Sequence, residues 1–256
     1  MQRSTFWLPV LVFGLGLALS LFSCEHAPMG MDEDITPIDT TGNNNPDTTG
    51  TDTTNMGTPC DPDVVYFEWD ILPILRSNCA LSGCHDEITH EEGVILTSYA
   101  KVMETGEVKA FNPGGSKLYR MITDNDPEDR MPPAPNQALS SSQISLINKW
   151  ILQGAKNETC DPDAGLCNTE NVSYVQDIQP VLQNNCRGCH SGNTPSGGIL
   201  LDTHANVAAI ANSGRMYGAI SWQSGFVRMP LGAVNPLPQC TVDKIKAWID
   251  AGAPNN

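Results

Sequence analysis

The stretch Cys186-Arg187-Gly188-Cys189-His190 decides how the second half of this chain is interpreted. Two cysteines about one helical turn apart, followed directly by a histidine, form the C-x-x-C-H pattern that is typical of covalent haem attachment. The two thiols can form thioethers with the vinyl groups of one porphyrin, and the histidine then lies under the iron as an axial ligand. Two cysteines and a histidine also suit zinc or a redox-active dithiol, so the context of the motif has to decide.

An internal repeat provides that context. Short segments recur in the same order: 70–75 (DILPIL) as 177–182 (DIQPVL), Cys84-His85 as Cys189-His190, Arg130-Met131-Pro132 as Arg228-Met229-Pro230, and Trp150-Ile151 as Trp248-Ile249. Chance does not readily align cysteine, histidine, methionine and tryptophan in one order twice. The sequence therefore predicts two domains of common ancestry, at residues 60–160 and 161–256.

The first repeat carries a wider version of the haem motif. Cys79 and Cys84 are separated by four residues, and His85 follows. Two extra residues then have to bulge between the thioether positions. Because His85 and the downstream Met131 are both retained, we favour a haem here over a repeat that has lost its haem and keeps only a disulfide or a metal.

A sixth iron ligand is predicted from the methionines. Among the methionines of the two domains, only Met131 and Met229 coincide under the repeat, and each follows an arginine and precedes a proline. A histidine–methionine pair saturates the iron and raises its reduction potential, which suits electron transfer. The alternative is that each methionine fills a gap in the core. Arg130 and Arg228 can pair with haem propionates or remain solvated.

The secondary structure is expected to be mainly α-helical, with short helices and long loops around each haem. Asp70 and Asp177 are expected as N-caps of a helix that runs into the first cysteine, with a proline in the first turn. Apolar residues at helical spacing predict a second helix over residues 140–153, and the same pattern recurs over residues 241–251. A glycine follows each of these helices and is expected to end it.

With these residues identified, each repeat resembles a small class I cytochrome c domain. The Gly-Ile-Leu and Trp-Ile-x-x-Gly-Ala details look like the planctomycete-type cytochrome c domains found in exported proteins. The resemblance covers nearly all of residues 60–256. It implies that the terminal helices pack around one haem edge, with Trp150 and Trp248 near their crossing. The wider spacing from Cys79 to Cys84 is the main departure from the family pattern.

Four cysteines remain outside the motifs and are disulfide candidates. Cys60 and Cys167 stand at the same distance before the first motif cysteine of their repeats. Cys60 can then close its domain with Cys160, and Cys167 with Cys240. Pairing of Cys160 with Cys167 is the main rival, because those two are close in sequence.

The N-terminus is interpreted as an export signal. Arg3 precedes an uncharged apolar run from Phe6 to Phe22, which is short for a membrane span and typical of a signal peptide over residues 1–23. The ending Leu21-Phe22-Ser23-Cys24 resembles a bacterial lipobox, which implies cleavage before Cys24 and acylation of its thiol. A single transmembrane anchor is the alternative. We expect lipid anchoring to a bacterial membrane, in the periplasm or at the cell surface.

Charge limits the choice of partners. The chain has a formal net charge of −15, and the polar tether at residues 24–59 carries seven acidic residues without lysine or arginine. Its composition predicts a flexible segment. The negative charge argues against nucleic acid or anionic lipid as a ligand and favours a basic redox partner. Contact with the membrane is then expected only through the lipid. Nine cysteines also fit an oxidising compartment.

Three functions can be compared on these residues. A dihaem electron carrier accounts for the motifs and for the matched methionines. A dihaem peroxidase-like enzyme needs one iron with an open or displaceable sixth site, which two retained methionines disfavour, so we expect a carrier and not an enzyme. A surface protein with disulfides alone leaves the Cys-His pairs unexplained. His204 aligns with Tyr99 and is therefore expected at the surface or the haem rim, not as a ligand.

Overall fold

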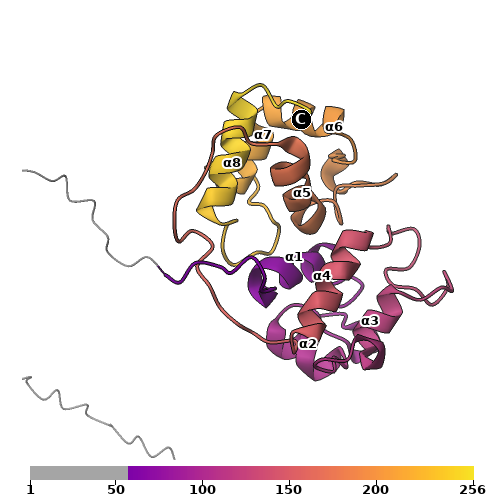
Figure 1. Cartoon of the computed structure of the whole chain (residues 1–256). Coiled ribbons are helices and arrows are strands. Elements are labelled where there is room, and N and C mark those ends of the chain that lie inside the picture. The colour runs from indigo at the N-terminus through magenta and orange to yellow at the C-terminus, as the bar shows by residue number, and fades with distance from the viewer. Residues whose placement is uncertain (1–56) are drawn as a thin grey trace, which may run out of the picture. The chain divides into compact units, whose positions relative to one another are not determined.

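The computed structural model describes residues 57–256 (Figure 1). The predicted signal peptide, the acylation site Cys24 and the tether up to residue 56 lie outside the described residues. Among residues 57–256, the only β-pairing is one isolated bridge between Pro59 and Asp161. Over the same residues, no helix has the length and apolar character needed to cross a bilayer.

Helices occur in the same order in both repeats, except that η3 of the first repeat has no counterpart in the second. The first repeat contains η1 (Phe67–Ile71), α1 (Leu72–Asn78), η2 (Glu91–Gly93), α2 (Tyr99–Thr105), η3 (Pro113–Gly115), α3 (Lys117–Ile122) and α4 (Ser141–Leu152). The second contains η4 (Tyr174–Ile178), α5 (Gln179–Asn185), η5 (Ser196–Gly198), α6 (His204–Asn212), α7 (Arg215–Ile220) and α8 (Gln239–Asp250). The mainly helical fold class is confirmed, whereas α2, α3, α6 and α7 were not predicted.

The first helical segment of each repeat begins earlier than the sequence predicted. A π-helical turn, η1 or η4, precedes α1 or α5, so Asp70 and Asp177 lie inside the first turn. Each carboxylate accepts a hydrogen bond from the backbone N–H four residues before it, Tyr66 at 2.7 Å and Ser173 at 2.9 Å. The expectation that they are N-caps was wrong. They satisfy the free N–H groups of the helix start from within the first turn.

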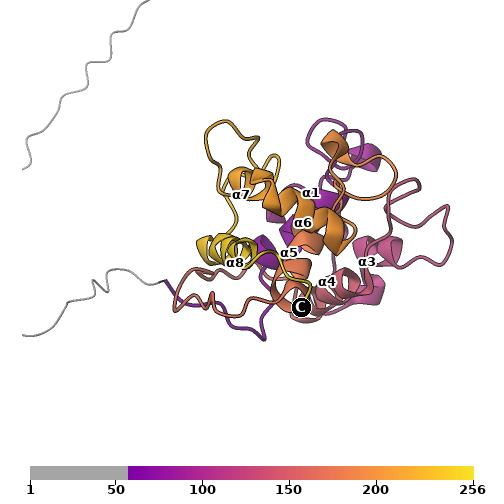
Figure 2. The same cartoon turned by 90° about the horizontal axis from the view of Figure 1, so that it is seen from above.

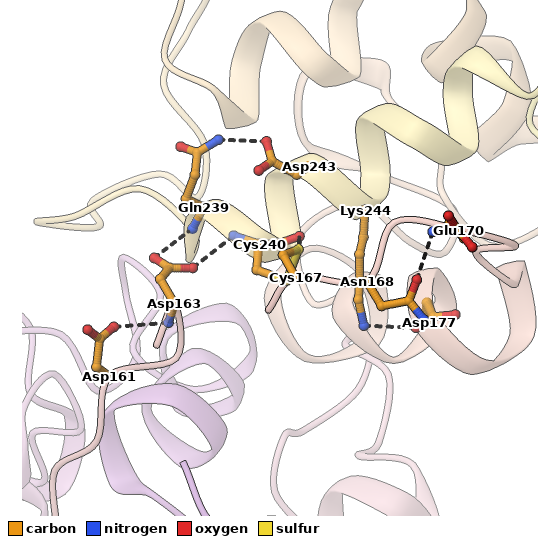
Figure 3. The surroundings of a disulfide bond; sticks show 10 residues. All are labelled: Asp161, Asp163, Cys167, Asn168, Glu170, Asp177, Gln239, Cys240, Asp243 and Lys244. Atoms are coloured by element: carbon orange, nitrogen blue, oxygen red, sulfur yellow. Dashed lines mark hydrogen bonds and ion pairs between the residues drawn. A yellow bond between two sulfur atoms is a disulfide. The ribbon is translucent and has the colours of Figure 1, made fainter. Parts of the chain in front are cut away.

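The last helix of each repeat begins with a different capping arrangement. Ser140 caps α4 in a reciprocal capping box with Gln143. Helix α8 begins after Pro238, and the carboxylate of Asp163 accepts from the N–H groups of Gln239 and Cys240 at 2.9 and 2.8 Å (Figure 3). An acidic side chain from a preceding loop therefore replaces the usual N-cap residue of α8. The positive end of the helix dipole favours a carboxylate at this position.

Each repeat has its own hydrophobic core. Buried residues from Val65 to Ala155 form one cluster, and those from Val172 to Ala253 form the other. Trp150 lies 5.4 Å from Phe67 between ring centroids, and Trp248 stacks on Tyr174 at 5.6 Å. The tryptophans therefore lie where the first and last helices of each repeat meet, as the resemblance implied. The domain borders at 60–160 and 161–256 stay predictions.

One disulfide links two distant segments within each repeat. Cys60 pairs with Cys160 and Cys167 with Cys240, at Cα–Cα distances of 4.9 and 5.5 Å. These are the pairings expected from the repeat, and the rival Cys160–Cys167 bond is not formed. In Figure 3, the second disulfide joins the linker that carries Asp163 to the first turn of α8. The linker is therefore attached to this helix both covalently and through the Asp163 carboxylate.

Candidate functional site

The motif loops begin directly at the C-terminal ends of α1 and α5. Helix α1 ends at Asn78 and α5 at Asn185, so the next residue in each case is the first motif cysteine. The backbone N–H of His85 donates to the Cys79 carbonyl at 3.2 Å, and that of His190 donates to the Cys186 carbonyl at 3.0 Å. The same bond closes both loops although they differ in length. The two extra residues of the first loop are therefore accommodated without changing how the histidine is tied to the first cysteine.

Each histidine is oriented by a carbonyl on the same downstream segment. Nδ1 of His85 lies 3.3 Å from the Val94 carbonyl oxygen, and Nδ1 of His190 lies 3.3 Å from that of Ile199. His190 has a second carbonyl, that of Ser196, at 3.1 Å. Because a carbonyl only accepts, Nδ1 carries the proton in this arrangement. Nε2 is then the nitrogen with a free lone pair, as in metal-ligating histidines whose other nitrogen is hydrogen-bonded.

The matched methionines are fixed by a shared backbone contact. The N–H of Met131 donates to the Met121 carbonyl at 2.9 Å, and that of Met229 donates to the Ala219 carbonyl at 3.0 Å. The acceptors lie on the corresponding helices α3 and α7. Both methionines are half-buried, and Met131 packs against the first core. The loops that carry the predicted sixth ligands are thus anchored at equivalent points.

The four motif cysteines differ in state from the four that form disulfides. Among the described residues, Cys79, Cys84, Cys186 and Cys189 are free thiols. Burial, together with the smaller effect of the neighbouring motif cysteine, raises the pKa of both the Cys79 and the Cys186 thiols to about 12. Redox-active dithiols show the opposite shift, toward an accessible thiolate. Within residues 57–256, no three side chains of His, Cys, Asp or Glu converge as a metal site.

A cavity of about 400 Å³ borders the first motif. Leu81, between Cys79 and Cys84, lines it together with Pro132, which follows Met131. Its lining also includes Arg187 and Gly188 of the second motif, so it is bordered by both motif loops. Paired free thiols, an imidazole with a free Nε2 and a thioether on an anchored loop are the types of donor that a c-type haem requires.

Other residues singled out in the sequence have different surroundings. The guanidinium of Arg228 lies over the Trp222 ring, 5.1 Å from its centroid. Neither Arg130 nor Arg228 forms an ion pair within residues 57–256.

His204 is half-buried and takes part in an aromatic cluster of the second repeat, and its place at a haem rim stays a prediction. Its ring lies 4.7 Å from that of Tyr174, and its Nε2 is 3.0 Å from the Ala253 carbonyl.

One family comparison bears on these sites. Residues 82–135 match the family described as Planctomycete cytochrome C, which supports a planctomycete-type cytochrome c domain in the first repeat. A cytochrome c domain of this kind implies covalently bound haem and haem-based electron transfer. The matched segment contains Cys84, His85 and Met131 and begins after Cys79. No curated protein and no solved structure matches the chain.

Proposed function

We propose that the chain is a dihaem c-type cytochrome that passes single electrons between redox partners outside the cytoplasm. Cys79 and Cys84 would hold one haem and Cys186 and Cys189 the other. The axial ligands would be His85 with Met131, and His190 with Met229. The matched segment supports a haem in the first repeat, and the C-x-x-C-H motif supports one in the second.

One observation carries this proposal: the ligand-bearing residues of both repeats are held by the same hydrogen bonds. Each histidine gives Nδ1 to a carbonyl at 3.3 Å and its N–H to the first motif cysteine, and each methionine gives its N–H to α3 or α7. A methionine that only filled a gap would not need a matching backbone anchor. The shared scheme favours two sites that orient the same pair of ligands.

The chain's residues favour electron transfer over substrate chemistry. When bound, a c-type haem supplies one iron that cycles between the ferrous and ferric states. The Nε2 of each histidine and the Sδ of each methionine would occupy both axial positions and leave no site for a substrate. Burial of the motif then contributes to the reduction potential.

Location and partners form part of the proposal. We propose export and lipid attachment through Cys24, with electron-transfer proteins of basic surface as partners. The disulfides Cys60–Cys160 and Cys167–Cys240 are consistent with an oxidising compartment. The net charge of −15 favours encounter with a positively charged partner surface.

The deciding experiment is a haem count on the purified full chain. Wild-type protein should carry two haems by mass and by the spectrum of its pyridine adduct. The paired variants Cys79→Ser/Cys84→Ser and Cys186→Ser/Cys189→Ser should each carry one. A wild-type count of zero would overturn the proposal. If the wild type carries one haem, and this haem is kept in Cys79→Ser/Cys84→Ser but lost in Cys186→Ser/Cys189→Ser, the proposal is restricted to the second repeat. Metal analysis for zinc on the same samples tests the rival use of the motif.

Spectroscopy separates a carrier from a peroxidase-like enzyme. Wild-type irons should both be low-spin, because each has two strong axial ligands. Met131→Ala and Met229→Ala should each create one high-spin iron that binds carbon monoxide. A high-spin iron in the unmodified protein would instead favour the peroxidase-like alternative, in which one site is open.

A further inference from the structure

Two helices of corresponding position lie against each other within the described residues. These are α1 of the first repeat and α5 of the second, each of which leads into the first cysteine of its motif (Figures 1 and 2). We call this contact, together with Gln143 and Gly188, the seam.

Side chains of the first repeat satisfy carbonyls of the second at the seam. Ser77 Oγ donates to the Asn184 carbonyl at 2.9 Å, and Gln143 Nε2 donates to the Gln183 carbonyl at 3.0 Å. Both acceptors lie in the last turn of α5, where helix carbonyls have no partner in their own helix. Ser77 and Gln143 are buried. Both hydrogen bonds are partly buried, so loss of either donor would leave a partly buried carbonyl unsatisfied, and the two bonds favour one register of the repeats.

The second motif loop touches the first repeat at its backbone. A Cβ placed on Gly188 would overlap the Ser77 carbonyl group, so only glycine fits without movement. The next residue, Cys189, has its Sγ 3.7 Å from the Ser77 carbonyl oxygen. Ser77 is separated from Cys79 by Asn78 alone. The thiols of the two motifs are thus joined by a short run of covalent bonds and one non-covalent contact.

From these contacts we infer that the seam is the electron path between the two haems, and that Gly188 is a positioning residue for it. The inference rests on the proposed function, because it needs both haems. The path runs from the sulfur of Cys189 across 3.7 Å to the Ser77 carbonyl and then through bonds to Cys79. One electron leaves the ferrous iron of one haem and reduces the ferric iron of the other, and no bond forms or breaks.

The cavity beside the first motif is consistent with this path. Its lining includes Leu81 from the first motif and Arg187 and Gly188 from the second. The cavity therefore lies between the two attachment loops, with residues of both repeats in its lining. Because residues of both repeats line this cavity, the two attachment loops lie close together. This favours electron exchange between the proposed haems of one molecule over exchange through a partner protein.

The test measures electron exchange in the full haem-loaded chain. Met229→Ala opens one iron to carbon monoxide, which serves as a photolabile probe. With that iron ferrous and the other ferric, a flash removes the probe and the electron redistributes to the first repeat. Adding Gly188→Ala to Met229→Ala should abolish the fast phase of electron redistribution, because the added methyl group pushes the second motif loop away from Ser77. Gly114→Ala is the matched control, because its Cβ would have no heavy atom of the described residues within 4 Å apart from its chain neighbours.

Hydrogen exchange supplies a readout that does not depend on electron transfer. Amides of residues 183–189 should exchange faster in Gly188→Ala than in the parent, and at the parental rate in Gly114→Ala. If Gly188→Ala fails to load its second haem, Ser77→Ala combined with Gln143→Ala opens the seam without touching either motif. That pair should also slow the redistribution phase.

The outcomes separate the path from the function it serves. Two haems with a lost phase in the seam variants support both. Two haems with an unchanged phase, in a variant whose seam amides exchange faster, overturn the path and leave the dihaem proposal standing. A parent with fewer than two haems overturns the dihaem proposal and the path together.

Discussion

The loops that carry Met131 and Met229 show how the two repeats have diverged. The segment before Met131 is acidic, whereas the segment around Met229 exposes large apolar side chains and has no acidic residue between 223 and 236. The acidic set is Asp124, Asp126, Glu128 and Asp129, and the exposed apolar set is Phe226, Val227, Leu231 and Val234. Yet both methionines keep the same backbone anchor. The internal contacts that orient the proposed ligands are retained, while the surface beside them differs.

A second difference lies in the packing that supports each site. Tyr99 donates its hydroxyl to the Ala155 carbonyl at 2.9 Å, and His204 stands in the same place with Nε2 at 3.0 Å from Ala253. A residue type can therefore change while its hydrogen bond is kept. The comparison of the repeats teaches that the hydrogen-bonding positions constrain the structure more strongly than the residue types do. Each prediction below tests one matched pair of positions.

The largest effect on stability is expected from the disulfides. Cys60→Ser/Cys160→Ser and Cys167→Ser/Cys240→Ser should each lower the free energy of unfolding by about 2–4 kcal/mol. The two losses should be similar, because the paired cysteines are 100 and 73 residues apart and the loop term grows only with the logarithm of length. Urea denaturation of the haem-loaded variants measures both. Losses that differ several-fold would show that local contacts outweigh loop closure.

Mild reduction should distinguish the two disulfides by the rate at which each one opens. Cys167 is exposed, whereas Cys60 and Cys160 are half-buried. Access governs the rate of thiol–disulfide exchange, so the Cys167–Cys240 bond is expected to open first. Alkylation of the released thiols followed by peptide mass analysis identifies the bond. Prior release of Cys60 and Cys160 would contradict the expectation.

The features that could be predicted from the sequence were those that depend on the spacing of nearby residues. The Cys-His pairs, the matched methionines and the apolar spacing of the last helices are short-range patterns, and the structure has helices α4 and α8 there. Gly154 and Gly252 follow them with φ of +99° and +89°, as expected for glycine after a helix. The disulfide pairing also followed from comparing the repeats.

The remaining features depend on contacts that leave no local pattern. Helices α2, α3 and α7 have seven residues or fewer, too short to show a clear apolar stripe. The π-helical turns before α1 and α5 moved the helix starts, so the capping role of Asp70 was misjudged. The bond from Ser77 to Asn184 joins residues more than a hundred positions apart. Such a bond is set by tertiary packing and has no signature in either segment.

A medium effect is expected from the aromatic pair. Tyr99→Phe and His204→Phe keep a ring in the cluster but remove the donor to Ala155 or Ala253. Each should cost about 1 kcal/mol of unfolding free energy, the usual net worth of one hydrogen bond. His204→Tyr replaces the imidazole by the side chain of the first repeat and should cost less than His204→Phe. Thermal unfolding ranks the variants, and equal losses for His204→Tyr and His204→Phe would argue against equivalent hydrogen-bonding positions.

The smallest effect concerns the paired aspartates, whose pKa values are shifted in opposite directions. Burial raises the pKa of Asp70 above its ordinary 3.8, outweighing the lowering by the Tyr66 N–H bond and by the charge of Lys149. Burial also raises that of Asp177, but the Ser173 N–H and Lys244, at 3.1 Å, bring its pKa below 3.8. The difference has a simple source, since the place of Lys244 is taken by Leu146 in the first repeat.

Opposite shifts give opposite pH slopes of stability. The raised pKa of Asp70 favours the folded state fully below pH 3.8, and this contribution is lost as the pH rises through the folded pKa. The lowered pKa of Asp177 contributes above pH 3.8 and is lost as the pH falls through its folded value. The loss of stability caused by Asp70→Asn should therefore shrink with rising pH, and that caused by Asp177→Asn should grow. Leu146→Lys should give the first repeat the slope of the second, with Lys244→Leu as the reciprocal control. Urea midpoints measured from pH 3 to pH 7 decide it, because a slope unchanged in both variants would mean that Lys244 does not set the difference.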